Sequence, residues 1–184
     1  MNSQIIKDSR LAEEYLRVEH PSGLTMLLYP MKGFSTAYAM FSTKYGSIDT
    51  CFQRGEDADF VKMPEGIAHY LEHKMFESEE GDAFEKYAQT GASANAFTSF
   101  DKTCYLFACT DRFQESLEIL LDCVTHSYFT KETVEKEQGI IGQEIRMYED
   151  DPGWRVMFNL LQSLYQNNRV DVGLPARLEA TAHI

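Results

Sequence analysis

The run His69-Tyr70-Leu71-Glu72-His73 limits the possible folds of this chain more than any other feature. An α-helix turns by about 100° per residue, which places His69, Glu72 and His73 at about 0°, 300° and 40° around its axis. The three side chains therefore share one face if the segment is helical. Two imidazoles one turn apart can bind one metal ion, and the carboxylate beside them can reach a water on that metal. HxxEH is the inverted form of the HExxH zinc-site pattern.

A catalytic zinc ion needs a third protein ligand, which must come from another element. Glu144 is the candidate, near the end of an acidic helical run that begins at Glu135. Glu137 and Glu144 are seven residues apart, so they lie on the same helix face two turns apart. We expect Glu144 to be the ligand and Glu137 to hydrogen-bond one of the histidines. Gly139 and Gly142 lack a Cβ atom and would let another element approach the helix closely.

The same residues also allow plainer interpretations. Two histidines and an acid on one helix can face solvent without binding a metal. Glu137 and Glu144 can belong to a solvated helix face, because the chain has 29 aspartates and glutamates. The remaining histidines, His20, His126 and His183, are interpreted as structural or exposed, since they lie at a turn, a helix end and the chain end.

The hydrophobic pattern changes along the chain from the period of a strand to that of a helix. Alternating residues predict strands at residues 14–19, 25–29 and 36–43, the first two forming a hairpin, and a polar loop is expected at 44–63. Helices are predicted at residues 64–77, 82–89, 112–125, 130–150 and 154–166, with Asp111 and Thr130 as caps of the third and fourth. Paired strands are predicted at 92–100 and 103–110, and residues from 167 onward are expected to be irregular. This order indicates an α+β fold, a mainly antiparallel sheet with helices packed on one face.

Composition restricts the class of protein. A chain of 184 residues can bury a sizeable core, and 43% hydrophobic with 25% charged residues is typical of a soluble globular protein. The net charge of −12 opposes binding to nucleic-acid phosphates and anionic lipids, so we expect neither nucleic acid nor membrane as a partner. We expect no secretory signal, because residues 1–8 have no basic stretch followed by an apolar one. The sequence also has no apolar run long enough to span a bilayer and no CxxC pair among its four cysteines. We therefore expect reduced thiols and a cytoplasmic location.

Three motifs occur in an order that is specific to one family. Residues 69–77 resemble the HxxEH segment of the pitrilysin/insulinase family of zinc metallopeptidases, which includes the mitochondrial processing peptidases. Residues 91–98 resemble the G-x-x-x-N-A-x-T strand of that family, and Glu137 with Glu144 resembles its second acidic motif. The resemblance covers residues 23–168. In particular, the chain resembles the cytosolic bacterial members often called YmfH-like, and it matches them at residues 45–49 and 140–145.

The resemblance implies a role for the histidines and the glutamate of the HxxEH segment and for the two glutamates of the second acidic motif. His69, His73 and Glu144 would bind Zn²⁺. Glu72 would be the general base of a zinc metalloendopeptidase, and Glu137 would support one of the histidines. The substrates implied are peptides or unfolded segments.

The resemblance also implies a strand that binds the substrate. Family members bind a peptide as an added strand on a sheet edge, which would be residues 94–99 here. Asn95 and Ala96 would pair with the peptide through their main chains, and Phe97 and Thr98 would lie beside it. The alternative from the residues alone is an ordinary core strand.

Family members enclose the substrate between two similar halves. Residues 1–184 are expected to form a single, partial N-terminal zinc-peptidase domain, truncated at its C-terminal end and without the second half. The expected partners are therefore a peptide substrate and a second peptidase-like half, on the same full-length chain or on a partner subunit. The alternative function is a non-catalytic half that binds a peptide or a partner without cleaving it. A third hypothesis is that the histidines are merely structural.

Overall fold

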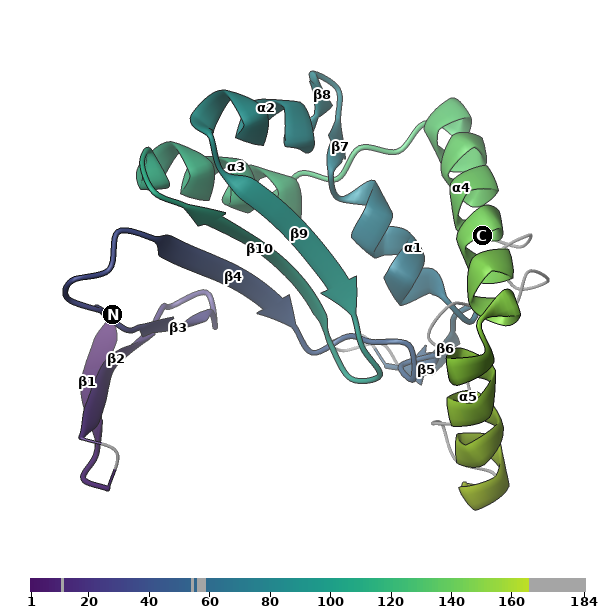
Figure 1. Cartoon of the computed structure of the whole chain (residues 1–184), viewed down its shortest axis with the longest axis horizontal. Helices are drawn as coiled ribbons and strands as arrows, with labels where there is room; N and C mark the ends of the chain where they lie inside the picture. Colours follow the sequence, from purple (N-terminus) through teal and green to yellow (C-terminus); the bar gives the residue numbers. More distant parts are fainter. Residues whose placement is uncertain (11, 54, 56–58, 166–184) are drawn as a thin grey trace. The chain divides into compact units, whose positions relative to one another are not determined.

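The computed structural model describes residues 1–184 except 11, 54, 56–58 and 166–184 (Figure 1). The chain divides into two compact units, Met1–Ser35 and Thr36–Ile184. The segment from residue 167 that was predicted to be irregular lies outside the described residues, as does His183. Each unit has its own sheet, and the candidate site belongs entirely to the second unit.

The first unit is a three-stranded antiparallel sheet in the order β1-β2-β3. The predicted hairpin is confirmed: β2 (Glu13–Glu19) pairs with β3 (Thr25–Leu28) around a turn in which Gly23 has a φ of 91°. The sequence reasoning missed β1 (Asn2–Asp8), which pairs with β2 along its whole length. Its sequence lacks a clear alternation of apolar and polar residues, so only the pairing with β2 reveals it as a strand.

The sheet of the second unit confirms the other predicted strands. It contains β4 (Ala37–Thr43), β9 (Ser93–Thr98) and β10 (Thr103–Cys109), all antiparallel, in the order β4-β10-β9. Side chains on a strand alternate between its two faces. On central β10 this alternation buries Tyr105 and Phe107 in the core. Strand β9 lies at an edge of this sheet.

Three helices cover one face of this sheet, as the α+β prediction requires (Figure 1). They are α1 (Ile67–Lys74), α2 (Ala83–Thr90) and α3 (Phe113–Thr125). Buried side chains from these helices and their connections meet β10 in one cluster that includes Phe76, Tyr87, Leu120 and Cys123. This core fixes α1 against β9 and β10.

A second cluster joins α1 to the long helix α4 (Lys131–Asp150). Tyr70 on α1 packs with Ile141 and Ile145 on α4, and all three are at most 2% exposed. Burial of two or three large apolar side chains contributes several kcal/mol, at about 25 cal/mol per Å². This contact determines which face of α4 is turned toward the two histidines.

Some element boundaries differ from the prediction. Helix α1 begins at Ile67, because Gly66 before it has a left-handed φ of 81°. It ends at Lys74, and the next residues form a small ladder of β7 (Glu77–Ser78) and β8 (Gly81–Asp82). The predicted loop at 44–63 contains a second short ladder, β5 (Cys51–Phe52) with β6 (Val61–Lys62). Ladders of two residues are too short to give a periodic signal.

The helix caps were predicted correctly only in part. Thr130 is the N-cap of α4, and its hydroxyl accepts from Thr133 N as expected. Asp111 does not cap α3: Arg112, with a φ of 50°, is the N-cap, and the Asp111 carboxylate accepts from Arg112 N. Helix α5 (Pro152–Leu164) begins at the proline that was predicted to separate two helices. Proline is well suited to the first helical position, because its missing N–H would have no partner there.

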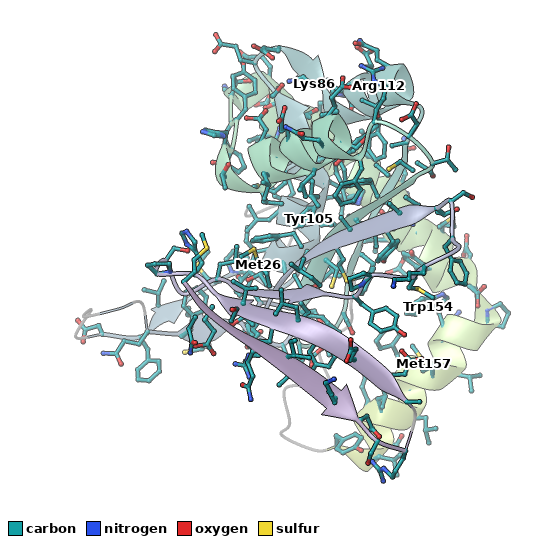
Figure 2. All side chains as sticks on the ribbon, turned by 90° about the vertical axis from the view of Figure 1, so that its left-hand side faces the viewer. Met26, Lys86, Tyr105, Arg112, Trp154 and Met157 are labelled. Carbon is teal, nitrogen blue, oxygen red and sulfur yellow. The ribbon has the colours of Figure 1, made fainter. Side chains whose placement is uncertain are left out.

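Two basic side chains lie at one end of the second unit, and two large apolar side chains lie at the other end. Figure 2 shows Lys86 and Arg112 together near α2 and α3, and Trp154 and Met157 on α5 at the opposite end. In the part of the chain that the structure describes, no helix is both long and apolar enough to cross a bilayer.

Candidate metal centre

Helices α1 and α4 bring the three predicted metal ligands together. His69 and His73 lie one turn apart on α1, and their Nε2 atoms are 3.3 Å apart. Glu144 on α4 completes the group, with Oε1 at 3.6 Å from His69 Nε2 and Oε2 at 3.4 Å from His73 Nε2. All three side chains are partly buried. The sequence predicted that the two histidines share one face of α1 and that Glu137 and Glu144 share one face of α4. The packing of α1 on α4 brings these two faces together.

The donor atoms lie close enough together for one zinc ion to contact all three residues. Ligand atoms that lie about 2.05 Å from a common centre at tetrahedral angles are about 3.3 Å apart. The two Nε2 atoms are 3.3 Å apart, His69 Nε2 is 3.6 Å from Oε1 of Glu144, and His73 Nε2 is 3.4 Å from the other carboxylate oxygen, Oε2. One donor atom from each of the three residues lies within 4.8 Å of the other two. Two imidazole nitrogens with one carboxylate oxygen is also a donor set found in catalytic zinc sites, which keep a fourth position open. The residues present therefore fit a zinc ion.

Glu137 lies where it can orient His73. Its Oε1 is 2.8 Å from His73 Nδ1, and its side chain is 8% exposed. A carboxylate only accepts hydrogen bonds, so Nδ1 carries the proton and Nε2 keeps its lone pair for a metal in the neutral ring. His69 differs, because its buried Nδ1 has no hydrogen-bond partner among the described residues.

The charges around the two imidazoles favour a cation. Hydrogen bonds to Glu137 and then Glu144 raise the pKa of His73 to about 10, although burial alone would lower it. Hydrogen bonds with His69 and His73 hold the pKa of Glu144 well below its usual range, although burial opposes this. An ionised carboxylate beside an imidazole is stabilised by positive charge at this point. A proton can supply that charge, and a divalent cation can replace it.

Glu72 lies on the same helix face as the histidines, and its carboxylate contacts β9. Thr98 Oγ1 donates a hydrogen bond to Glu72 Oε2 at 2.5 Å. Both residues line a cavity of about 250 Å³ together with the three candidate ligands. This cavity therefore contains a metal-binding group, a carboxylate beside it and part of an edge strand.

The residues that were predicted to bind substrate lie on strand β9. Ala96, Phe97 and Thr98 line the cavity, and Phe97 is 40% exposed. Asn95 is exposed and does not line the cavity, but its Oδ1 accepts a hydrogen bond from Ala96 N at 2.9 Å. Its side chain thus satisfies a main-chain donor of the edge strand locally.

The sequence reasoning missed two aromatic residues of the cavity, Tyr148 and Trp154. Tyr148 lies one helical turn after Glu144, so the same i, i+4 spacing that links His69 to His73 could have identified it. Trp154 packs edge-on against Tyr148 and is stacked on Phe158. Its place depends on the turn between α4 and α5, for which the sequence offers no comparable signal.

Comparison with known proteins identifies the family. The family model described as Insulinase (Peptidase family M16) matches residues 55–175. The zinc protease YmfH of Bacillus subtilis (strain 168) is 46% identical over 179 residues, which are 97% of this chain and 42% of that protein. This chain therefore spans about two fifths of the length of that relative.

Solved structures agree with this assignment. An M16-like peptidase from Alicyclobacillus acidocaldarius superposes with a TM-score of 0.87 at 40% identity, covering 92% of this chain and 40% of the other. Pitrilysin superposes with a TM-score of 0.76 at 18% identity over 97% of this chain and 19% of its own, which supports the fold alone. The predicted α+β peptidase fold and the predicted family are confirmed. The chain belongs to the insulinase family of peptidases, peptidase family M16.

Proposed function

We propose that this chain carries the zinc site of a metalloendopeptidase that cleaves peptides or unfolded segments. One observation carries the proposal: the His69–His73–Glu144 group and the Glu72 carboxylate share one cavity with an edge strand. Membership of a peptidase family and the name of the Bacillus subtilis relative as a zinc protease support it. The His-His-Glu donor set, which is one that catalytic zinc sites use, supports the choice of metal.

His69, His73 and Glu144 would hold the zinc ion, and Glu137 would keep His73 in the tautomer that presents Nε2. Zinc, when bound, supplies a Lewis acid that polarises a carbonyl and makes water acidic enough to attack it at neutral pH. Glu72 takes a proton from the attacking water on its carboxylate and then passes that proton to the leaving amine. A general base of this kind typically contributes a factor of about 10² to 10⁴ in rate.

The substrate would bind along β9. This strand has a neighbour, β10, on only one side among the described residues, so its other edge can pair with an extended peptide. The peptide would displace the contact between Asn95 Oδ1 and Ala96 N. Phe97 would lie against a substrate side chain, because it is exposed at the cavity. Main-chain pairing places no demand on the peptide sequence, which suits a protease of unfolded segments.

The relatives are more than twice as long as this chain, so we propose that a second peptidase-like half completes the enzyme. That half would be part of the full-length chain or a separate subunit, and would enclose the peptide against β9. The protein would act in the cytoplasm.

The experiment is a comparison of zinc content and peptide cleavage between the full-length protein and its Glu72→Gln variant. We expect one zinc ion per site in both proteins and a loss of cleavage of about 10²-fold or more in the variant. Glu65→Gln is a matched control, because Glu65 precedes the same helix and does not line the cavity. Equal cleavage by wild type and Glu72→Gln would refute the mechanism. Zinc without cleavage by the wild type would favour the non-catalytic peptide-binding half instead.

A further inference from the structure

The hydrogen bond between Thr98 and Glu72 joins two elements of the proposed site. Thr98 is the last residue of β9, and Glu72 lies 26 residues earlier on α1. The distance between Thr98 Oγ1 and Glu72 Oε2 is 2.5 Å, which is at the short end for a hydroxyl donating to a carboxylate. Such charge-assisted bonds are about twice as strong as those between neutral groups.

The alternation of β9 points the Thr98 side chain toward α1. Ala94, Ala96 and Thr98 are partly buried, whereas Asn95 and Phe97 between them are exposed. Helix α1 packs against β9, and Ala94 and Ala96 contact the core on that side. Successive side chains of a strand point to opposite faces of the sheet. Thr98 therefore points to the face that α1 covers, and Phe97 points to the other face.

The end of β9 is fixed on both sides, so Thr98 can hold Glu72 in place. On one side, Thr98 is paired with Thr103 of β10 in the ladder. The next residue, Ser99, donates to Lys102 O at 2.8 Å and accepts from Ser47 N at 3.0 Å. A side chain held on a supported strand keeps its partner within a narrow range of positions.

We propose that Thr98 is a positioning residue for the general base, which rests on the function proposed above. Its hydroxyl holds Oε2 of Glu72 and leaves Oε1 to accept the proton of the attacking water. The sequence reasoning predicted that Thr98 would contact substrate. We assign its side chain to Glu72 instead, and leave contact with the substrate to the main chain of β9 and to Phe97.

The test compares Thr98→Val with Thr98→Ser in the full-length, zinc-loaded protein. Valine keeps the branched shape and removes the hydroxyl, whereas serine keeps the hydroxyl. We expect Thr98→Val to lower kcat by about 10- to 100-fold, because a small displacement of a catalytic group can cost about 100-fold in rate. KM should change by less than about twofold, since the hydroxyl does not contact the peptide. Thr98→Ser should restore most of kcat.

Thr103→Val is the matched control. It removes the same chemical group from the opposite residue of the ladder, where the hydroxyl bonds a main-chain carbonyl and not Glu72. We expect it to lower thermal stability but to leave kcat within about twofold of the wild type, because its loss is structural. A loss of kcat equal to that of Thr98→Val would show that any weakening of this hairpin lowers activity, and would overturn the proposal.

A double-mutant cycle tests the link without using activity. Thr98→Val should lower the Tm of the otherwise wild-type protein, and should lower it by less than about half as much when Glu72 is already alanine. Equal shifts in both backgrounds would overturn the link. So would an unchanged kcat in Thr98→Val, or a Thr98→Ser variant as slow as Thr98→Val.

These outcomes separate this inference from the proposed function. A wild type that cleaves peptides, together with an inactive Glu72→Gln and a fully active Thr98→Val, refutes only the role of Thr98. A zinc-loaded wild type that cleaves no peptide refutes the proposed function and, with it, a catalytic purpose for this hydrogen bond.

Discussion

Glu137 and His73 are joined by a 2.8 Å contact between Oε1 and Nδ1, while Nε2 of the same ring faces Glu144 at 3.4 Å. One imidazole thus contacts two carboxylates from the same helix face of α4, seven residues apart. Such an arrangement orients the ring along the line between the two acids. It also links the affinity for a metal to a residue that does not itself bind the metal.

The first prediction concerns this link. Glu137→Ala should weaken zinc binding by about 10- to 100-fold, because His73 loses the acceptor that fixes its tautomer and orientation. Competition with a chromophoric chelator measures the affinity. Glu135→Ala is the control, since Glu135 is an exposed acid on the same helix that pairs only weakly with Lys131, at 3.8 Å. Equal affinity in the Glu137→Ala variant and the wild type would contradict the role of Glu137.

The second prediction concerns removal of the metal. Free zinc at about a thousand times Kd stabilises a folded protein that binds it by about 4 kcal/mol. For a chain of this size that corresponds to a rise in Tm on the order of 10 °C. A chelator should reverse the rise, and Glu144→Ala should remove most of it, because the third ligand is lost. Calorimetry with and without zinc gives both values. A full zinc-dependent shift in Glu144→Ala would exclude Glu144 as a ligand.

The metal ligands could be predicted from the sequence because their spacings within each helix are local. The separation of His69 from His73 and that of Glu137 from Glu144 follow from helical periodicity alone. The approach of the two helices is not local, since it depends on the packing of Tyr70 against Ile141 and Ile145. Helical spacing identified Glu144 as a candidate third ligand, and the family resemblance implied the same role, but only the structure shows that α4 packs against the helix of the two histidines.

Other features were beyond prediction for different physical reasons. The hydroxyl of Thr98 reaches Glu72 because β9 packs beside α1, and no sequence spacing encodes that contact. Gly139 was expected to allow close approach of another element, but it is exposed and has open space around it. Gly142, the other glycine of this prediction, is buried on α4. A close approach of main-chain atoms is found at Gly46, in a loop where no periodic pattern draws attention to it.

The third prediction concerns Gly46 and Gly139. A Cβ atom on Gly46 would lie 2.5 to 2.6 Å from main-chain atoms of residues 100–102, so Gly46→Ala should destabilise the fold by about 3 kcal/mol. Gly139→Ala should stabilise it by about 0.5 to 1 kcal/mol, because alanine is the better helix former and meets nothing within 4 Å. Urea unfolding measures both. A Gly46→Ala variant as stable as the wild type would contradict the close approach of this loop to the β9–β10 turn.

The fourth prediction concerns the ion pair at the end of α1. Lys74 is 0% exposed and pairs with Glu77, which also pairs with Lys136 of α4 at 3.2 Å. Glu77→Gln leaves a buried ammonium without its counter-charge, so we expect a loss of about 3 kcal/mol. Replacing the pair by Lys74→Met with Glu77→Leu should recover most of that loss, since well-packed apolar residues can substitute for a buried pair.

The control for this pair is Glu80→Gln. Glu80 pairs with Lys86 at 2.9 Å, but its side chain is 80% exposed. An exposed pair contributes little, so no measurable loss is expected. A Glu77→Gln variant that unfolds at the same urea concentration as Glu80→Gln would contradict a stabilising role for the buried pair.

The fifth prediction separates the four cysteines by their reactivity. Cys51 is exposed, whereas Cys104, Cys109 and Cys123 are at most 8% exposed. Burial raises the pKa of Cys123 to about 11, and it also raises the pKa of Cys109, so both remain unreactive thiols at about pH 8 in the folded protein. Alkylation followed by peptide mapping should therefore label Cys51 first, and the other three at a comparable rate only in denaturant. Labelling of Cys123 as fast as Cys51 without denaturant would show that the core between α3 and β10 opens readily, because only the thiolate of an accessible side chain reacts.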